Sequence, residues 1–239
     1  MANDNNPIPR RDFLVAAGTA VAAGLASSSA DAQTNTAAAP AASTASAPAE
    51  GVLTLTPMEQ AFFAAAVDTL IPADELTPSG SDCGLVVFID RELAGAWGSG
   101  AKMYRSGPFR KGKPEQGYQL ALTPREFFAV GISATNEWSR KTYGKDFDRL
   151  APKEREVALK ELEGGKAALS DFNGKEFFEA LLTITMEGFF ADPIYGGNRN
   201  KVGWKMVGYP GLPAVYTNLI DEYRNKRYSV EPQSIADFS

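Results

Sequence analysis

The chemistry open to this chain is that of carboxylates, because other catalytic side chains are scarce. The sequence contains no histidine and a single cysteine, Cys83. Histidine triads, histidine general bases and histidine metal sites are therefore excluded. One thiol supplies neither an iron–sulfur cluster nor the Cys-x-x-Cys-His attachment of a c-type haem. If the chain works in a redox complex, another subunit must hold the redox centres.

Carboxylates near the apolar faces or ends of the expected helices are the remaining candidates for acid–base chemistry. They are Asp68, Asp90, Glu137, Glu187 and Asp192. A glycosidase-type pair needs two carboxyl groups about 5–9.5 Å apart across a cleft, which spacing along a sequence does not show. The chain has no Gly-x-Gly-x-x-Gly fingerprint, Walker motif or Gly-x-Ser-x-Gly elbow. Three classes remain: a carboxylate-based enzyme, a periplasmic binding module and a non-catalytic subunit.

Cys83 has two interpretations. A helix capped by Asp82 would place the thiol in its first turn, where the helix dipole lowers a thiol pKa. No histidine or second cysteine accompanies it, so the sequence favours a small core or surface residue.

The densest group of unusual residues is the segment GFFADPIYGGNRNKVGWKMVGYPG, residues 188–211. Its prolines and paired glycines define the backbone at fixed points, as in an ordered loop. Aromatic and arginine side chains of this kind dominate protein–protein hot spots. The segment is interpreted either as a packed loop that closes a helical domain or as a docking surface. The side chains expected to contact a partner are Asp192, Tyr195, Arg199, Trp204, Lys205 and Tyr209.

The N-terminus has the pattern of an export signal. Arg10 and Arg11 are followed by the apolar pair Phe13 and Leu14, which fits the twin-arginine motif. A mild apolar run over residues 14–26 follows, which is within signal-peptide length and short of a bilayer span.

An A-x-A site, Ala30-Asp31-Ala32, predicts cleavage before Gln33. The alternative is an uncleaved N-terminal anchor. Residues 1–32 are thus expected to be a twin-arginine signal peptide, and residues 33–50, rich in Ala, Pro, Ser and Thr, a disordered linker.

Residues 51–239 are predicted to form a single, mainly α domain of about five helices with long ordered loops. Capping boxes with proline at the first helical position begin helices at Pro57 and Pro124. Further helices are expected after Asp82, from Pro152 to the glycines at 164–165, from about 174 to 190, and over 214–227, with an extended polar tail. No alternating strand pattern is present.

The loop over residues 98–117 is rich in Gly, Lys and Arg and contains Tyr104 and Phe109. A long loop in a compact domain is usually functional or disordered. Nucleic-acid binding is not expected, because the chain carries a net charge of −5.

The segment from Asp192 to Gly211 resembles the signature of the gluconate 2-dehydrogenase subunit 3 family, the gamma chain of membrane-bound flavin sugar-acid dehydrogenases. The motifs DPxYGGNR, GWK and GYPG occur in the family's order and spacing, and residues 104–109 and 117–119 also match. The resemblance covers about residues 55–211.

This resemblance implies a complex with two other chains. The large subunit carries FAD and oxidises a sugar acid, gluconate to 2-ketogluconate in the named enzyme, and related complexes act on other sugars and polyols. A multihaem cytochrome c passes electrons to the membrane quinone pool. The small subunit supplies the signal for the twin-arginine translocase, stabilises the large subunit and holds no cofactor. The chain is thus expected to be periplasmic and to meet the membrane only through the complex.

Overall fold

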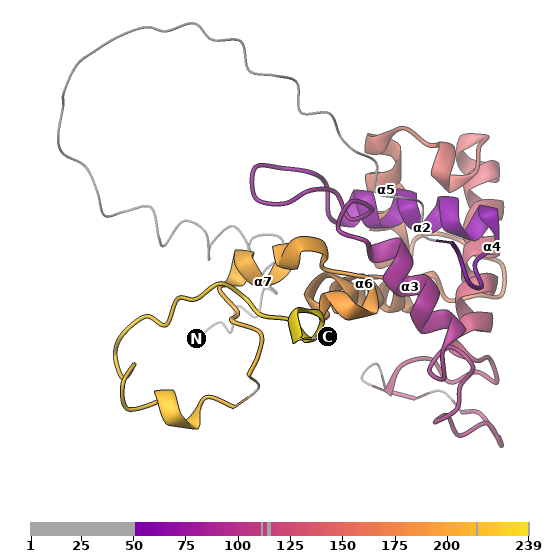
Figure 1. Cartoon of the computed structure of the whole chain (residues 1–239). Coiled ribbons are helices and arrows are strands. Elements are labelled where there is room, and N and C mark those ends of the chain that lie inside the picture. The colour runs from indigo at the N-terminus through magenta and orange to yellow at the C-terminus, as the bar shows by residue number, and fades with distance from the viewer. Residues whose placement is uncertain (1–50, 111, 114–115, 214, 239) are drawn as a thin grey trace, which may run out of the picture. The chain divides into compact units, whose positions relative to one another are not determined.

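The computed structural model describes residues 51–110, 112–113, 116–213 and 215–238 (Figure 1). The predicted signal peptide and linker lie outside the described residues. Within the described part of the chain the regular elements are helices and no β-strand is present. The prediction of a mainly α domain is therefore confirmed. The α-helices are α2 (Pro57–Leu70), α3 (Leu85–Ala94), α4 (Pro124–Tyr143), α5 (Pro152–Glu163), α6 (Gly174–Phe190) and α7 (Val202–Val207).

Local signals in the sequence set the starts of α2 and α4. Thr56 accepts a hydrogen bond from the Glu59 backbone N–H, and the Glu59 carboxylate accepts one in return from the Thr56 N–H at 2.8 Å. Thr123 and Glu126 form the same reciprocal pair at α4. Both predicted capping boxes are confirmed, and they satisfy N–H groups that a helix start leaves without partners.

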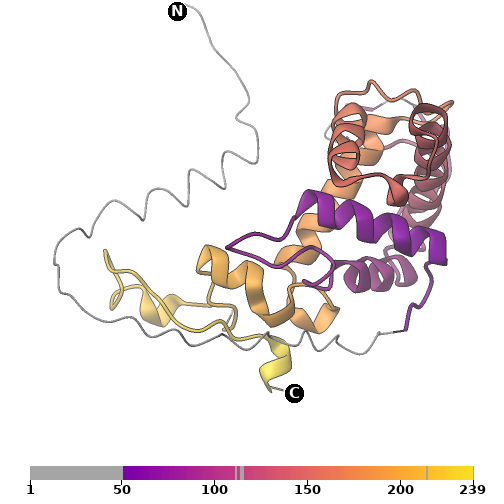
Figure 2. The same cartoon turned by 90° about the horizontal axis from the view of Figure 1, so that it is seen from above.

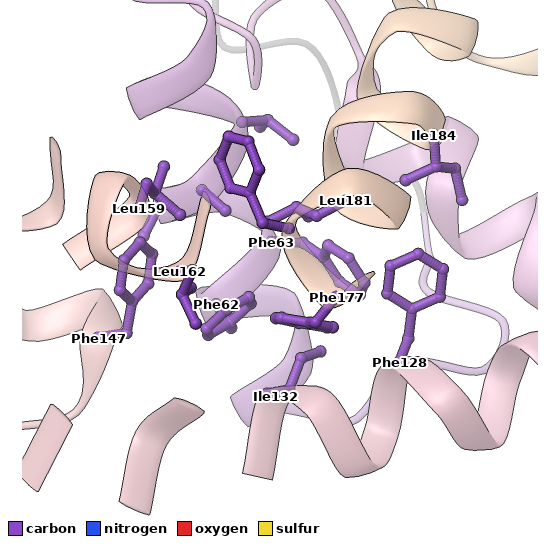
Figure 3. Packing of buried hydrophobic residues seen from close by; sticks show 14 of the residues in the cluster. Phe62, Phe63, Phe128, Ile132, Phe147, Leu159, Leu162, Phe177, Leu181 and Ile184 are labelled. Carbon is purple, nitrogen blue, oxygen red and sulfur yellow. The ribbon is translucent and has the colours of Figure 1, made fainter. Parts of the chain in front are cut away.

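The core is aromatic and is organised around α6, which contacts α2, α3, α4, α5 and α7. The ring of Phe177 on α6 lies 6.0 Å from that of Phe62 on α2 and 6.0 Å from that of Phe128 on α4, measured between centroids. Figure 3 shows these rings together at the meeting point of the three helices. In Figure 2, α2 crosses α6. Such ring contacts bury large apolar areas, so α6 is held from several sides.

The start of α3 differs from the prediction. The helix begins at Leu85, after Gly84 in the left-handed conformation at φ 83°. Asp82 does not cap it, because its carboxylate accepts a hydrogen bond from the Ser79 hydroxyl in the preceding turn at 3.0 Å. Cys83 therefore precedes α3, and Trp97 lies beyond its end.

The predicted helix over residues 214–227 is also wrong. The described residues there form a short 3-10 helix, Thr217–Leu219, followed by turns, and a second 3-10 helix, Ile235–Phe238, lies in the tail expected to be extended.

No helix among the described residues is both long and apolar enough to cross a bilayer.

Cys83 is a core residue. It is 1% exposed, and its thiol lies 3.7 Å from the Pro78 carbonyl oxygen. Burial raises the pKa of the Cys83 thiol to about 11, and the carboxylates of Asp82 and Asp68 add to the effect. The core interpretation is confirmed, and the dipole-lowered pKa is not found.

We predict that Cys83 resists alkylation in the folded chain. At pH 8 an unfolded thiol with a pKa near 8.5 is partly thiolate, whereas the folded thiol is almost entirely protonated and shielded. Iodoacetamide labelling followed by mass spectrometry should be slower by roughly 100-fold or more than for the same chain in urea. Equal rates in the two conditions would contradict the buried placement.

Candidate functional site

The segment 192–211 turns back at the end of α6 and packs against that helix and α3. After Asp192 it forms two short 3-10 helices, Pro193–Tyr195 and Arg199–Lys201, and then α7. The first of these turns lies beside α3, where the Arg91 guanidinium donates to the Ile194 carbonyl oxygen at 3.4 Å. The segment is thus an ordered loop, as its prolines and glycines predicted.

Asn198 joins the end of α6 to the start of α7. Its side chain is fully buried, its amide nitrogen donates to the Ala191 carbonyl at 2.9 Å, and its amide oxygen accepts from the Gly203 N–H at 2.8 Å. The residue adopts φ 46°, a conformation that asparagine tolerates better than most side chains. The sequence analysis did not single out Asn198; its position directly after two glycines was the available signal.

Two glycines let this loop touch the backbone of α6. A Cβ atom on Gly197 would collide with the Gly188 carbonyl, and one on Gly203 would collide with the Phe189 carbonyl. Both approaches therefore require a residue without a side chain. The backbone of the loop therefore packs directly against the backbone of the last turn of α6.

Trp204 points into the domain. It is 5% exposed, and its indole N–H donates to the Phe190 carbonyl at 2.8 Å. The Tyr209 ring meets it edge-on, with centroids 5.2 Å apart. Trp204 thus packs within the domain, and its expected contact with a partner stays a prediction.

Asp192 is likewise engaged within the chain. One carboxylate oxygen accepts from the Ile194 N–H at 3.0 Å, and the other from the Ile235 N–H at 2.9 Å. Asp192 thus fixes the start of the loop through Ile194 and links the loop to the C-terminal residues through Ile235.

Arg199 is half-buried, and its backbone N–H donates to the Cys83 carbonyl at 3.1 Å. Its side chain lies against Gly84, so it packs on the turn before α3. The residue supports the fold of the loop in addition to any contact that its exposed part makes.

The remaining predicted side chains are exposed. Tyr195 is 52% and Tyr209 44% exposed, and Lys205, also exposed, pairs with Glu231 at 2.7 Å. The apolar side chains of Ile194 and Val207 lie open on the same segment. A rigid surface of tyrosine and aliphatic side chains is suited to binding another protein.

Four of the five candidate carboxylates are occupied by internal contacts. Asp90, 3% exposed, accepts from the N–H groups of residues 53–55 at 2.6 to 2.9 Å. Asp68 accepts from the Ser81 N–H at 2.7 Å, and Glu137 pairs with Lys141 one helical turn away. Asp192 is tied to backbone groups as described above. These groups stabilise turns and helices through the contacts named here.

Glu187 is the exception, because it lines a groove of about 700 Å³ between α4, α6 and a stretch that contributes Trp97, residues 112–113 and residues 117–120. Burial raises the pKa of Glu187, and Glu92 nearby adds to the shift. The groove has an aromatic floor, in which the Tyr118 and Phe127 rings stack at 4.0 Å. Glu176 and Glu179 also line it, whereas among the described residues no cluster of His, Cys, Asp or Glu could hold a metal ion.

A sequence model of gluconate 2-dehydrogenase subunit 3 matches residues 57–211, more than half of the chain. The chain belongs to this family. The family match begins with α2 and ends with the segment 192–211, so it includes the helical core and the loop that packs against the end of α6. No curated protein and no solved structure matches the chain. The family name indicates an accessory subunit of an oxidoreductase complex.

We predict that Trp204→Ala destabilises the free chain. Removing a buried indole that also donates a hydrogen bond should lower the free energy of unfolding by ~3–5 kcal/mol. Urea unfolding followed by circular dichroism measures this loss. Tyr195→Ala, an exposed aromatic truncation in the same segment, is the control and should change stability by at most ~0.5 kcal/mol. Equal stabilities for the two variants would show that Trp204 does not support the fold.

Proposed function

We propose that the chain is the non-catalytic small (gamma) subunit of a periplasmic, membrane-associated, FAD-dependent sugar-acid dehydrogenase of the gluconate 2-dehydrogenase type. Family membership is the observation that carries this proposal. The absence of histidine and the burial of the single cysteine agree with redox centres in other chains. FAD then belongs to the large subunit and haem c to a multihaem cytochrome c subunit.

The surface of residues 192–211 is the proposed contact with the flavoprotein subunit. Tyr195, Tyr209 and Lys205 supply exposed side chains, while Trp204 and Asp192 hold the segment in shape from beneath. Arg199 contributes to both roles. A preformed surface binds with less loss of conformational entropy than a flexible one, which is what a stabilising subunit requires.

The second part of the proposal is export. Residues 1–32 would form a cleaved twin-arginine signal and residues 33–50 a linker to the helical domain of residues 51–239. The twin-arginine route carries folded proteins, so one signal on this chain would serve a partner that has already bound its flavin. The complex, rather than a helix of this chain, would provide the association with the membrane.

The alternative is a free-standing periplasmic enzyme or binding module. The groove beside Glu187 is the specific observation in its favour, since a carboxyl group with a raised pKa in a partly apolar groove is suited to general acid catalysis.

Substitution of the exposed tyrosines tests the proposed contact. Tyr195→Ala and Tyr209→Ala should each weaken assembly with the flavoprotein subunit by ~2 kcal/mol or more, the size expected of an interface anchor. Affinity would be measured by titrating the tagged chain against the co-expressed, flavin-loaded partner. Tyr104→Ala, which removes a tyrosine that is 81% exposed in another loop, is the matched control and should bind normally.

If Tyr104→Ala alone loses binding, the contact with the flavoprotein subunit lies in the loop over residues 98–117 and not in residues 192–211. Oxidation of gluconate by this chain without any partner would instead favour the carboxylate-enzyme alternative.

Substitution of the signal tests the escort role. In a strain producing both chains, Arg10→Lys combined with Arg11→Lys should leave this chain and the flavoprotein in the cytoplasm, because the translocase recognises the arginine pair. Fractionation and immunoblotting of both chains measure the outcome. If the flavoprotein still reaches the periplasm, the escort role is wrong even where the two chains form a complex.

A further inference from the structure

The chain continues beyond the family match and returns to the surface of residues 192–211. We call residues 215–238 the C-terminal arm. Its base is closed by two backbone hydrogen bonds, from Leu212 N–H to the Gln233 carbonyl at 2.8 Å and from Gln233 N–H to the Pro210 carbonyl at 3.0 Å. In Figure 1 the two ends of this orange-to-yellow loop meet beside α7. The arm therefore leaves and rejoins the domain at one place.

Polar contacts fasten the end of the arm to the loop after α6. Lys201 donates to the Pro232 carbonyl at 2.9 Å and to the Asp237 carboxylate at 2.5 Å. Asp192 accepts from the Ile235 N–H, and Ser234 is 1% exposed. The hydrogen bonds from Lys201 and Ser234 lower the pKa of Asp237 to about 2, so its carboxyl group is ionised throughout the physiological range.

Between its ends the arm is held by contacts among tyrosine rings, and none of its described large apolar side chains is buried. The Tyr223 and Tyr228 rings lie 4.7 Å apart, and Tyr216 stacks edge-on against Tyr228. Among the described residues after Phe190, Trp204 is the only core side chain. Most of the large apolar side chains of the arm are open to solvent, namely Val215 at 67%, Ile220 at 56%, Val230 at 45%, Ile235 at 40% and Phe238 at 67% exposed, while Leu219 is half-buried.

An ordered arm with exposed apolar side chains indicates that another molecule covers its surface. Ordering a long loop costs backbone entropy that burial within the loop does not offset here. The 3-10 helix that carries the exposed side chains of Ile235 and Phe238 contacts the 3-10 helix that carries Ile194 and Tyr195, so exposed apolar side chains of both segments lie in one region. Exposed apolar side chains gathered in this way are typical of interaction sites.

The charges of the arm indicate what kind of partner fits. The arm carries both signs of charge with no excess of positive charge: four acidic side chains, Asp221, Glu222, Glu231 and Asp237, and three basic ones, Arg224, Lys226 and Arg227. An anionic membrane surface or a nucleic acid would require such an excess. A protein surface with apolar pockets and charges of both signs does not.

We propose that the C-terminal arm lies on the dehydrogenase large subunit and extends the contact made by residues 192–211. This inference rests on the proposed function, and it assigns to that partner a surface outside the family match. The arm fixes the subunit to its partner through Val215, Ile220 and Phe238, while the Lys201–Asp237 contact holds it in position.

Limited proteolysis tests whether the arm is covered. Arg224, Lys226 and Arg227 are exposed, so trypsin should cut the free chain in the arm and cut it about tenfold or more slowly in the complex. Cleavage at Lys102 and Arg105, in another exposed loop, is the internal control and should continue in the complex. Equal cleavage of the arm in both states, or equal protection of the control loop, would overturn the proposal.

Substitution gives an independent measurement. Val215→Asp combined with Ile220→Asp should leave the melting temperature of the free chain unchanged and raise the Kd for the flavoprotein subunit by about tenfold or more. Val157→Asp on α5, where the side chain is 48% exposed, is the matched control and should bind normally.

The outcomes separate this inference from the proposed function. If Tyr195→Ala weakens the complex and the arm variant does not, the arm is not part of the contact and the subunit role stands. If the free chain protects its own arm as its concentration rises, a second copy covers the arm and the inference is wrong. If no complex forms with the unsubstituted chain, both fail together.

Discussion

The backbone contact between the last turn of α6 and the loop that follows is the constraint on which the exposed surface depends. Gly197 and Gly203 allow the chain to touch the carbonyl groups of Gly188 and Phe189. Asn198 and Trp204 then occupy the N–H and carbonyl groups that this approach leaves inside. Fixing such a loop costs ~1–2 kcal/mol per residue in backbone entropy, and these contacts supply part of the offset. The position of the exposed tyrosines is therefore set by the helical core.

The chain is stabilised in two different ways along its length. Up to Phe190 the helices are held by a core of phenylalanine, leucine and isoleucine side chains. After that point Trp204 is buried and Val202 and Met206 pack partly against the core, and the rest of the described segment relies on hydrogen bonds and ion pairs such as those of Asp192 and Lys201, each of which contributes on the order of 1 kcal/mol. Segments held in this way open more readily than a core. A protein that binds only the closed form would stabilise it by mass action, and folding of this end of the domain would then be coupled to assembly.

Local signals in the sequence predicted much of the fold, and long-range contacts account for the rest. The capping boxes at Thr56 and Thr123 act within one helical turn, so the sequence suffices to locate them. Asp82 failed as a cap because Ser79 binds its carboxylate, and the order of residues alone does not decide that competition. The burial of Trp204 and the double role of Asp192 arise from chain segments that meet only after folding. The helix expected over residues 214–227 failed because the apolar residues there have no core to face.

The contact between Lys201 and Asp237 also determines when the surface becomes complete. The two residues are separated by the whole arm, and proteins are synthesised from the N-terminus. The loop after α6 therefore leaves the ribosome without the segment that fastens it. A partner that needs both halves of the surface does not meet them on a nascent chain stopped at residue 211. It meets them only when synthesis has passed residue 237 and Asp237 has reached Lys201.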